Sequence, residues 1–319
     1  MENERIVVTR QPPGQALAIL ESAGSVWMWT EDRPIERQVL FDQITTATGL
    51  YTMLTDHVDE ALLKCAPDLR VVSQMAVGVD NIDLAACRNR GIKVGHTPDV
   101  LTETTADLAW GLLIAAARRF GEGTRDVAAG RWGDWDPNYL IGQDIHGSTV
   151  GIIGFGRIGR AVARRAVGFG MSVLYTQRRP VDLSDPQPSF VPLNELLERS
   201  DHVIVAAPLS TETHHLISTN ELRLMKPTAT LVNIGRGPLV DSAALHHALT
   251  SGEIFAAGLD VTDPEPIAPD HPLVTTPNCF ITPHLGSSTI RTRQAMAELA
   301  ARNLVAGLRG LALEAPVIA

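Results

Sequence analysis

The chain has 319 residues, of which 45% are hydrophobic and 20% charged, as expected for an ordinary globular protein of about two domains. Its 36 acidic residues outnumber the 27 lysines and arginines, and the net charge of −9 without a basic run argues against nucleic-acid or anionic-membrane partners. No apolar stretch approaches the roughly 20 residues that cross a bilayer, and the acidic N-terminus does not resemble a signal peptide. The 3 cysteines are widely spaced, so we expect reduced thiols, no metal site and a cytoplasmic protein.

Short apolar runs rich in valine and isoleucine alternate with helical stretches along the whole chain. Runs that are apolar throughout are typical of strands buried on both faces of a parallel sheet, so this alternation predicts an α/β architecture. There are too many runs for one comfortable sheet, and we expect two doubly wound parallel sheets. The predicted strands are 6–9, 26–29, 49–54, 70–75 and 93–96 in the first half, and 149–154, 171–176, 202–208, 228–235, 255–261 and 279–283 in the second.

A domain boundary is predicted near Pro98, where one long helix begins and continues from Asp99 to Phe120. The segment 121–147 has no strong periodicity, so it is interpreted as an excursion from the domain. Because chain ends often lie close together, we expect the last helix, 290–308, to pack back on the first domain. The expected domains are therefore residues 1–98 with 288–319, and residues 99–287, with the active site in the cleft between them.

A glycine-rich turn follows the first strand of the second half, where the sequence reads strand, G-x-G-x-x-G, helix. Gly154 allows the tight turn, Gly156 lets the backbone approach a pyrophosphate, and Gly159 permits close packing of helix on strand. The N–H groups at the start of the helix would then hold the phosphate charge. This context predicts a dinucleotide cofactor, although a merely structural turn is the alternative reading.

The end of the next strand indicates which dinucleotide binds. An NAD site expects an acidic residue there for the ribose 2′-hydroxyl, whereas this strand ends in Gln177, Arg178 and Arg179. Each arginine can give a 2′-phosphate a charge-assisted hydrogen bond. We therefore predict NADP(H), with NADH as the weaker alternative, while the opposing interpretation is that both arginines are ordinary solvated charges.

Three later strands end in residues that suit carbonyl reduction. Arg236, Glu265 and His284 follow three successive strands, and ligands of open α/β sheets bind at the carboxyl ends of strands. Arg236 can hold a carboxylate and polarise the adjacent carbonyl. His284 can protonate the oxygen, while Glu265 fixes its tautomer and favours the imidazolium. Each residue alone could equally be a surface charge, a turn residue or a satisfied histidine, so spacing leaves the trio a hypothesis.

Several motifs together resemble the D-isomer-specific 2-hydroxyacid dehydrogenases, in the order of that family and from about residue 50 to the end. They are 154–159 (GFGRIG), 233–237 (NIGRG), 258–261 (GLDV), 264–266 (PEP) and 283–287 (PHLGS). The resemblance implies a flavodoxin-like substrate domain and a Rossmann dinucleotide domain. It also implies that Arg236 binds substrate, that Glu265 is the carboxylate partner of the histidine, and that His284 is the acid/base.

The resemblance further implies the binding residues. The backbone N–H groups of Val77 and Gly78 would bind the substrate carboxylate, with Ser287 also in the substrate site and Asp260 beside the nicotinamide. The implied cofactor site comprises Gly154, Gly156, Arg157, Ile158, Gly159, Gln177, Arg178, Arg179, Pro208, Ile234, Asp260, His284 and Gly286.

Within the family, segments 130–135, 175–179 and 302–310 are similar to the glyoxylate/hydroxypyruvate reductases. This likeness implies NADPH-dependent reduction of glyoxylate to glycolate and of hydroxypyruvate to D-glycerate. It also implies a homodimer built by the excursion at about 118–147, with Trp135 limiting substrate size; an interface anchor without substrate contact is the other reading of Trp135. A D-lactate or phosphoglycerate type of dehydrogenase, and a dinucleotide-sensing protein like the corepressors of this fold, remain as alternatives.

Overall fold

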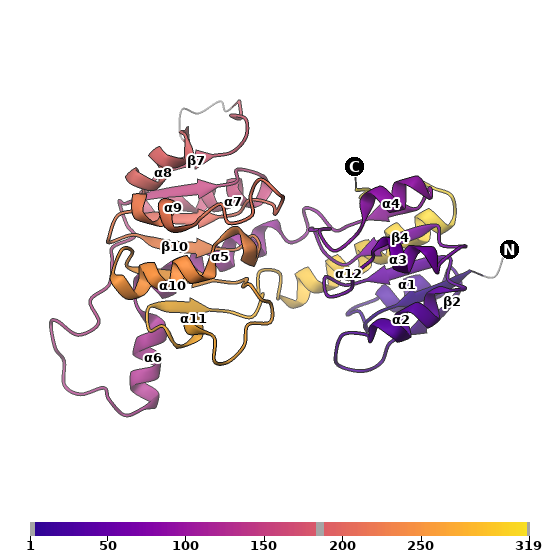
Figure 1. Ribbon diagram of the computed structural model, residues 1–319, viewed down its shortest axis with the longest axis horizontal. Helices are drawn as coiled ribbons and strands as arrows, with labels where there is room; N and C mark the ends of the chain where they lie inside the picture. The colour runs from indigo at the N-terminus through magenta and orange to yellow at the C-terminus, as the bar shows by residue number, and fades with distance from the viewer. Residues whose placement is uncertain (1–3, 183–187, 318–319) are drawn as a thin grey trace. The chain divides into compact units, whose positions relative to one another are not determined.

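The computed structural model describes residues 4–182 and 188–317 and divides the chain into two compact units (Figure 1). Unit 1 comprises Met1–Leu101 and Ser288–Ala319, and unit 2 comprises Thr102–Ser287. Each contains one sheet whose strands all pair in parallel, which confirms the predicted fold class. The first three residues of the acidic N-terminus considered above lie outside the described part of the chain.

Unit 1 is a five-stranded sheet in the order β2-β1-β3-β4-β5, the doubly wound order of flavodoxin. The C-terminal segment covers the outer edge of β5, where Gly95 forms an antiparallel bridge with Pro316. The strands are β1 (Arg5–Val8), β2 (Ser25–Met28), β3 (Gly49–Thr52), β4 (Val71–Gln74) and β5 (Lys93–Gly95). The helices are α1 (Ala16–Glu21), α2 (Arg37–Ile44), α3 (Glu60–Lys64), α4 (Leu84–Asn89) and α12 (Ile290–Leu308).

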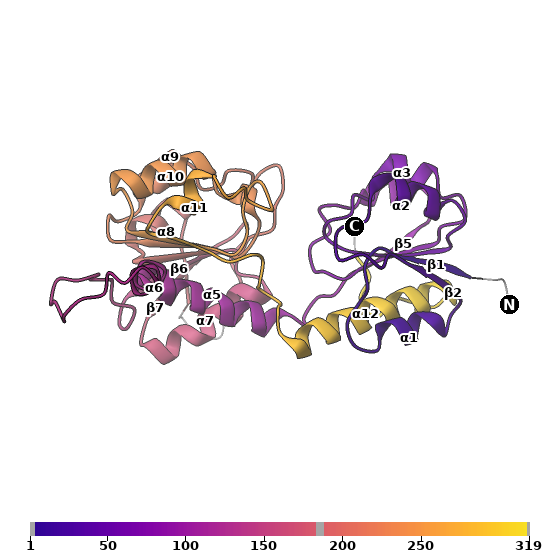
Figure 2. The same cartoon turned by 90° about the horizontal axis from the view of Figure 1, so that it is seen from below.

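Helices cover both faces of this sheet, with α12 and α1 on one side and α2 and α3 on the other (Figure 2). The last helix spans the predicted residues 290–308 and is tied to the sheet by buried side chains. Tyr51 donates its hydroxyl to the carbonyl of Ala297 at 3.1 Å, and Ser73 donates to Ala300 at 2.7 Å. Strands from the start of the chain and a helix from its end therefore share one core.

Unit 2 is a seven-stranded sheet in the order β12-β11-β10-β9-β6-β7-β8, so the strand order reverses between β6 and β9. In such a sheet ligands bind at that reversal, at the carboxyl ends of the strands. The strands are β6 (Thr149–Ile153), β7 (Ser172–Thr176), β8 (Ser189–Phe190), β9 (His202–Val205), β10 (Thr230–Asn233), β11 (Ala256–Leu259) and β12 (Cys279–Ile281). The helices are α5 (Thr102–Ala117), α6 (Phe120–Ala128), α7 (Arg157–Ala166), α8 (Leu193–Arg199), α9 (Thr219–Leu224), α10 (Ser242–Ser251) and α11 (Pro272–Thr275), with 3-10 turns η1 (Val167–Phe169) and η2 (Gly237–Leu239).

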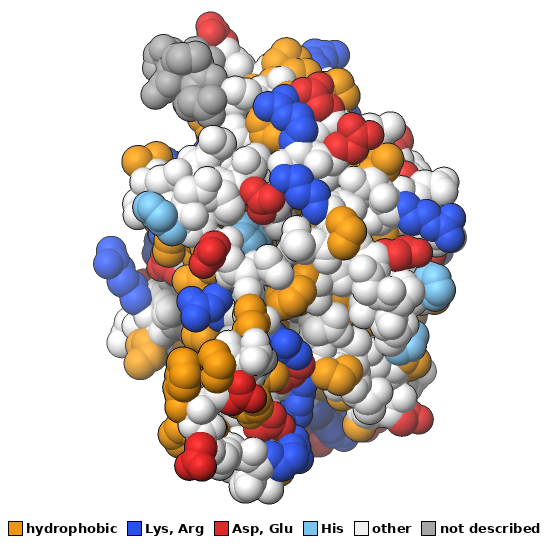
Figure 3. All heavy atoms as spheres, turned by 90° about the vertical axis from the view of Figure 1, so that its left-hand side faces the viewer, with side chains coloured by type: hydrophobic (Ala, Val, Ile, Leu, Met, Phe, Trp, Pro, Cys, Tyr) orange, Lys and Arg blue, Asp and Glu red, His pale blue; other side chains and the backbone are white. Residues whose placement is uncertain are grey.

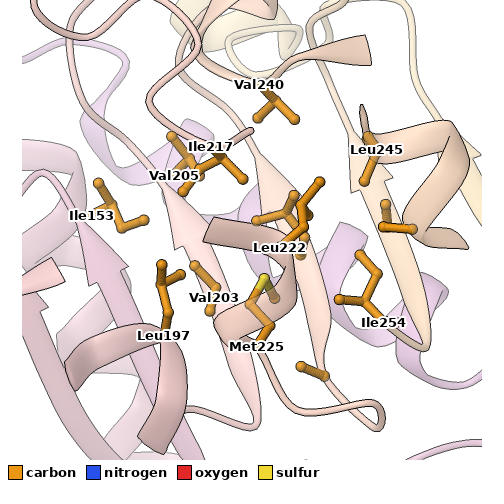
Figure 4. Close-up of a cluster of buried hydrophobic side chains, with 14 of the residues drawn as sticks. Ile153, Leu197, Val203, Val205, Ile217, Leu222, Met225, Val240, Leu245 and Ile254 are labelled. Carbon is orange, nitrogen blue, oxygen red and sulfur yellow. The ribbon is translucent and has the colours of Figure 1, made fainter. Parts of the chain in front are cut away.

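The core of unit 2 has two layers, one on each face of the sheet. On the face of α8, α9 and α10, side chains of β6 and β9 meet those of the helices (Figure 4). Val203 and Val205 of β9 are fully buried there, as are Leu197 and Leu222 from α8 and α9. Because both faces of the central strands are covered, these strands are apolar throughout, which is the pattern that the sequence displays.

The predicted single helix from Asp99 to Phe120 was wrong at both ends. The helix α5 begins at Thr102 and ends at Ala117, and Arg119 then adopts a left-handed φ of 56° before α6 begins. The chain returns against this end, since Gln143 donates its N–H to the Ala117 carbonyl at 2.9 Å. The segment interpreted as lacking periodicity therefore opens with a helix.

Candidate active site

Three neighbouring strands of unit 2 end at the same edge of the sheet, and each is followed by one residue of the predicted trio. The strands β10, β11 and β12 are adjacent and parallel. Arg236 follows β10, Glu265 follows β11 and His284 follows β12. Residues far apart in the sequence therefore gather where the carboxyl ends of the strands meet.

His284 and Glu265 form a direct pair. The His284 Nδ1 atom lies 2.6 Å from Glu265 Oε1, within the range of a charge-assisted hydrogen bond. The side chains are 31% and 43% exposed, so the pair borders solvent rather than lying in the core. Because Nδ1 is committed to the carboxylate, Nε2 is the ring nitrogen that can exchange a proton with a bound molecule.

The electrostatics of this pair favour the ionised carboxylate. Burial alone raises the pKa of Glu265, but the hydrogen bond and charge of His284, the Thr262 N–H and the charge of Arg236 outweigh it and hold that pKa below its usual range. The charge of Arg236 thus acts on the carboxylate of the pair, and the three predicted catalytic residues form one electrostatic group.

Asp260 supports the turn that carries the histidine. This residue is only 2% exposed. Its carboxylate accepts the N–H groups of Leu285 at 2.6 Å and Gly286 at 2.8 Å, and the hydroxyl of Thr282 at 2.7 Å. Sequence reasoning placed Asp260 beside a nicotinamide but missed Thr282, for which the sequence contains no distinguishing signal.

Arg236 lies in a turn that Asn233 shapes. Asn233 ends β10 and is 1% exposed, and its Nδ2 donates to the Arg236 carbonyl at 2.8 Å. Its Oδ1 accepts the N–H of Gly235 at 3.0 Å. The residue after the arginine, Gly237, must be glycine, because a Cβ there would lie 1.9 Å from the Thr262 carbonyl oxygen. Asn233 therefore positions the arginine. The sequence motif includes Asn233, but the sequence alone does not indicate this role.

The glycine-rich turn fits a dinucleotide phosphate. Gly154 has a φ of +93°, and a Cβ there would lie 2.6 Å from the Ala207 nitrogen. A Cβ on Gly159 would lie 2.2 Å from the Gly154 carbonyl, so helix and strand meet closely. Around the Cβ direction of Gly156, no atom of the described residues lies within 4 Å, which leaves room at the start of α7. Residues Arg157 and Ile158 form the first turn of that helix, whose N–H groups favour an anion.

The end of β7 presents cations, as the sequence indicates. Gln177 donates to the Arg179 carbonyl at 2.6 Å and so shapes a turn in which Arg178 and Arg179 are exposed. The charge of Arg178 reaches the loop after β9, because it contributes, after the hydrogen bond from Ser210, to lowering the pKa of Glu212. Sequence reasoning missed this acidic neighbour of the predicted 2′-phosphate site.

The remaining predicted cofactor residues of unit 2 also follow strand ends. Pro208 follows β9, and its carbonyl accepts the Thr213 hydroxyl at 2.8 Å. Ile234 is 8% exposed directly after β10. Gly286 lies in the Asp260 turn, and its carbonyl accepts the Thr105 hydroxyl of α5 at 3.1 Å. These residues surround the same edge of the sheet as the trio.

The predicted substrate residues are distributed over both units. Val77 and Gly78 belong to unit 1, in the loop after β4. Ser287 is 8% exposed at the end of unit 2. Trp135 lies in the segment after α6 and is 86% exposed, so within the described chain it contacts little. The structure thus gathers the trio and Asp260 in unit 2, and it describes the Val77 loop as part of unit 1.

Membrane-spanning helices and metal-binding clusters are both absent from the described residues. No helix there is long and apolar enough to cross a membrane. No group of three or more histidine, cysteine and acidic side chains in the described ranges is placed to hold a metal ion.

Comparison with known proteins identifies the family. Residues 110–286 match the model of the NAD-binding domain of D-isomer specific 2-hydroxyacid dehydrogenases, and the chain belongs to this family. It is an oxidoreductase chain with a Rossmann NAD-binding domain.

Two similar proteins carry the names of glyoxylate and hydroxypyruvate reductases. The chain is 46% identical to the glyoxylate reductase of Thermococcus gammatolerans over 96% of this chain and 93% of that protein. It is also 46% identical to the human glyoxylate reductase/hydroxypyruvate reductase, over 96% of this chain and 95% of the human protein.

Solved structures match over nearly the whole chain. The TT0316 protein of Thermus thermophilus matches with a TM-score of 0.93 and 46% identity, covering 98% of this chain and all of that one. An NADPH-dependent glyoxylate/hydroxypyruvate reductase of Sinorhizobium meliloti, solved with NADP and malonate, matches with a TM-score of 0.85 and 32% identity over 99% and 97% of the two chains. The chain is therefore a 2-hydroxyacid dehydrogenase that uses a nicotinamide dinucleotide and acts on small keto acids.

Proposed function

We propose that this chain reduces glyoxylate to glycolate and hydroxypyruvate to D-glycerate with NADPH, and that His284 is the proton donor. The observation that carries the proposal is the 2.6 Å contact between His284 Nδ1 and Glu265, at the sheet edge where Arg236 also follows its strand. The names of the relatives support the substrate class.

Each residue of the site has its own role in the proposed reaction. When bound, the nicotinamide supplies a hydride to the carbonyl carbon of the keto acid. His284 gives a proton from Nε2 to the carbonyl oxygen, so that hydride and proton together produce the hydroxyl group. Glu265 stabilises the imidazolium before the transfer, and the planar guanidinium of Arg236 holds the substrate carboxylate and polarises the carbonyl. Re-protonation of His284 from solvent completes the cycle.

The preference for NADPH rests on the end of β7. Arg178 and Arg179 can each donate to a 2′-phosphate, and none of residues 177–181, directly after the strand, is acidic and able to bind a 2′-hydroxyl instead. The Sinorhizobium meliloti relative is described as NADPH-dependent and was solved with NADP. NADH is expected to serve as a weaker substitute.

We assign roles to the two units on this basis. Unit 1 is the substrate-binding domain, where the backbone N–H groups of Val77 and Gly78 receive the carboxylate. Ser287, the last residue of unit 2, is also assigned to substrate binding. Unit 2 is the NADP-binding domain. We place the enzyme in the cytoplasm.

A homodimer is the proposed assembly. Hydrophobic side chains gather over α6 and the segment that follows it, in the lower part of Figure 3. Exposed hydrophobic side chains that gather on one surface are typical of an interface. We propose that this surface pairs with a second copy and that Trp135 reaches the substrate site of the partner. The exposed residues are Phe120, Val127, Trp132, Trp135, Tyr139 and Ile141.

Steady-state oxidation of NADPH and NADH with glyoxylate, hydroxypyruvate and pyruvate tests the proposal. Fast NADPH oxidation with the first two substrates and slow oxidation with pyruvate is the expected result. Activity mainly with NADH, or mainly with a bulkier keto acid, would overturn the cofactor or the substrate assignment. No turnover with any pair would favour a dinucleotide-sensing role.

The role of His284 is tested separately. The variant His284→Ala should reduce kcat by a factor of about 100 to 10,000, the usual range for loss of a general acid. NADPH affinity, measured by nucleotide fluorescence, should stay within about threefold because the ring does not hold the phosphates. Turnover close to that of the wild type would remove His284 as the proton donor.

A further inference from the structure

The loop after β4 in unit 1 has its carbonyl groups tied down one after another. The Ala76 carbonyl accepts the N–H of Thr97 at 2.8 Å, and the Val79 carbonyl accepts the N–H of Ile82 at 3.0 Å. Between them, the carbonyls of Val77 and Gly78 accept from side chains. Four consecutive carbonyl groups therefore all have hydrogen-bond donors within the unit.

The N–H groups of the same loop have the opposite arrangement. For Val77, Gly78 and Val79, the described residues provide no acceptor to any of the three N–H groups. Consecutive backbone N–H groups that point away from their carbonyls form a concave anion site, in which a carboxylate can be captured. Because each peptide group is planar, the contacts that hold the carbonyl oxygens also set the direction of the N–H groups.

Gln74 is one of the two side-chain anchors. It ends β4, is fully buried, and donates Nε2 to the Gly78 carbonyl at 2.6 Å. The second hydrogen of Nε2 goes to Asn81 Oδ1 at 2.7 Å, and Asn81 Nδ2 returns a hydrogen bond to Gln74 Oε1 at 2.9 Å. Asn81 also donates to the carbonyl of Asp56 at 2.7 Å. This reciprocal amide pair has one orientation only, so the donor to Gly78 cannot rotate away.

His96 is the second anchor. Its Nδ1 lies 2.9 Å from the Val77 carbonyl, and since a carbonyl only accepts, Nδ1 must carry the hydrogen. The backbone of His96 is fixed on both sides, because its N–H donates to Ala315 at 3.1 Å and its carbonyl accepts from the buried Asn303 at 2.9 Å. The anchor is therefore held by α12 and the C-terminal segment, more than 200 residues away in sequence.

We propose that Gln74 and His96 are positioning residues that hold the N–H groups of residues 77–79 toward the carboxylate of the keto acid. The inference rests on the proposed function, which places that carboxylate on the Val77 and Gly78 N–H groups. It adds that recognition depends on two side chains that hold the loop by its carbonyl oxygens and need not touch the substrate. Their effect should therefore fall on the binding of the carboxylate rather than on proton or hydride transfer.

The test compares His96→Leu, which removes the donor, with His96→Asn, whose amide can donate from nearly the same position. Steady-state constants for glyoxylate and NADPH are measured, together with the inhibition constant of oxalate, which has a similar carboxylate and no reducible aldehyde. We expect His96→Leu to raise the glyoxylate KM and the oxalate constant by about tenfold or more, the loss typical of a hydrogen bond at a charged site. Both kcat and the NADPH KM should stay within about twofold, and His96→Asn should restore the KM to within about threefold.

A matched control is Ser73→Ala, which removes a buried hydrogen bond of the neighbouring residue to α12. It should lower the melting temperature and leave the glyoxylate KM unchanged. An unchanged KM in His96→Leu, or a parallel loss in kcat and both KM values that His96→Asn does not restore, would overturn the positioning role. If the wild type reduces no keto acid, the proposed function fails, and calorimetric oxalate binding by the same variants still decides the inference: equal affinity in wild type and His96→Leu would overturn it.

Discussion

Asp260 and His284 are joined through the backbone, since the His284 N–H donates to the Asp260 carbonyl at 2.9 Å while the Asp260 carboxylate holds the two residues that follow the histidine. His284 itself has a φ of 55°, a left-handed conformation that non-glycine residues rarely adopt. Such a conformation persists only where neighbours impose it. The buried carboxylate therefore acts as the support that keeps the imidazole in place for Glu265.

Because the Asp260 carboxylate supports the turn, removing the Thr282 hydroxyl that donates to it should have a measurable effect. In Thr282→Val, the carboxylate of Asp260 loses a hydroxyl donor at 2.7 Å, and the free energy of unfolding should fall by about 1.5–3 kcal/mol, as for other hydrogen bonds to charged groups. The measurement is urea unfolding of the two proteins at pH 7. The matched variant Thr282→Ser retains the hydroxyl and should stay within about 0.5–1 kcal/mol of the wild type. A Thr282→Val variant as stable as the wild type would show that this hydrogen bond does not support the turn.

A second prediction concerns the pH dependence of reduction. Glu265 has a lowered pKa and is ionised at neutral pH, so its charge favours the protonated form of His284. In Glu265→Gln that charge is absent, so the imidazole loses its anionic partner. The alkaline limb of the pH profile for glyoxylate reduction should therefore move to lower pH.

The control for this shift is Glu265→Asp, which retains the charge and should leave the limb near its wild-type position even where kcat falls. The profiles are measured with saturating NADPH between pH 5 and 9. A limb that does not move in Glu265→Gln would show that the proton donor is not coupled to this carboxylate.

Much of the fold could be predicted because burial on both faces leaves a strong pattern in parallel strands. The same pattern fails for β8, where Ser189 and Phe190 are too short a run to recognise. It also fails for α6, which contains Gly121 and Gly123, each unfavourable in a helix by about 1 kcal/mol relative to alanine. That helix is stabilised by contacts that a local pattern does not contain, such as the hydrogen bond from Arg125 to the Pro277 carbonyl.

The candidate site, like the fold, could be predicted from the sequence only in part. The trio could be predicted because residues at the ends of adjacent parallel strands converge. The residues that orient the trio could not, since Thr282 and Asn233 become recognisable only when their partners are placed. His96 is the extreme case, because its backbone depends on Asn303 and Ala315 from the other end of the chain.

The arginines after β7 provide a third prediction. Replacing Gln177 by Asp together with Arg178→Ala and Arg179→Ala should move the preference from NADPH toward NADH, because the new carboxylate repels a 2′-phosphate and accepts from a 2′-hydroxyl. The ratio of kcat/KM for the two cofactors should change by about ten- to a thousandfold. An unchanged ratio would show that the 2′-phosphate binds elsewhere, and the exposed control Arg223→Ala should leave it unchanged.

The last prediction concerns His202, a buried titratable side chain that is not part of the trio. It is fully buried at the start of β9, and its Nε2 lies 3.1 Å from the Asp144 carbonyl. Within the described residues its Nδ1 has no hydrogen-bond partner. Burial lowers the pKa of His202, although the Asp144 carbonyl and the charge of Asp201 act in the opposite direction. The folded chain therefore keeps this ring neutral at a pH where the unfolded chain protonates it.

The sign of the pH effect follows from that difference. Above the pKa of about 6.5 that histidine has in the unfolded chain, the ring is neutral in both states. Below that pH, only the unfolded state gains a proton. The free energy of unfolding should therefore fall by up to about 1.4 kcal/mol per pH unit until the folded ring also protonates. In His202→Gln, the amide can still donate to Asp144 but does not titrate, so urea unfolding between pH 8 and 5 should show a shallower loss. The exposed control His57→Gln should keep the wild-type slope. Equal slopes in His202→Gln and wild type would assign the acid sensitivity to other groups.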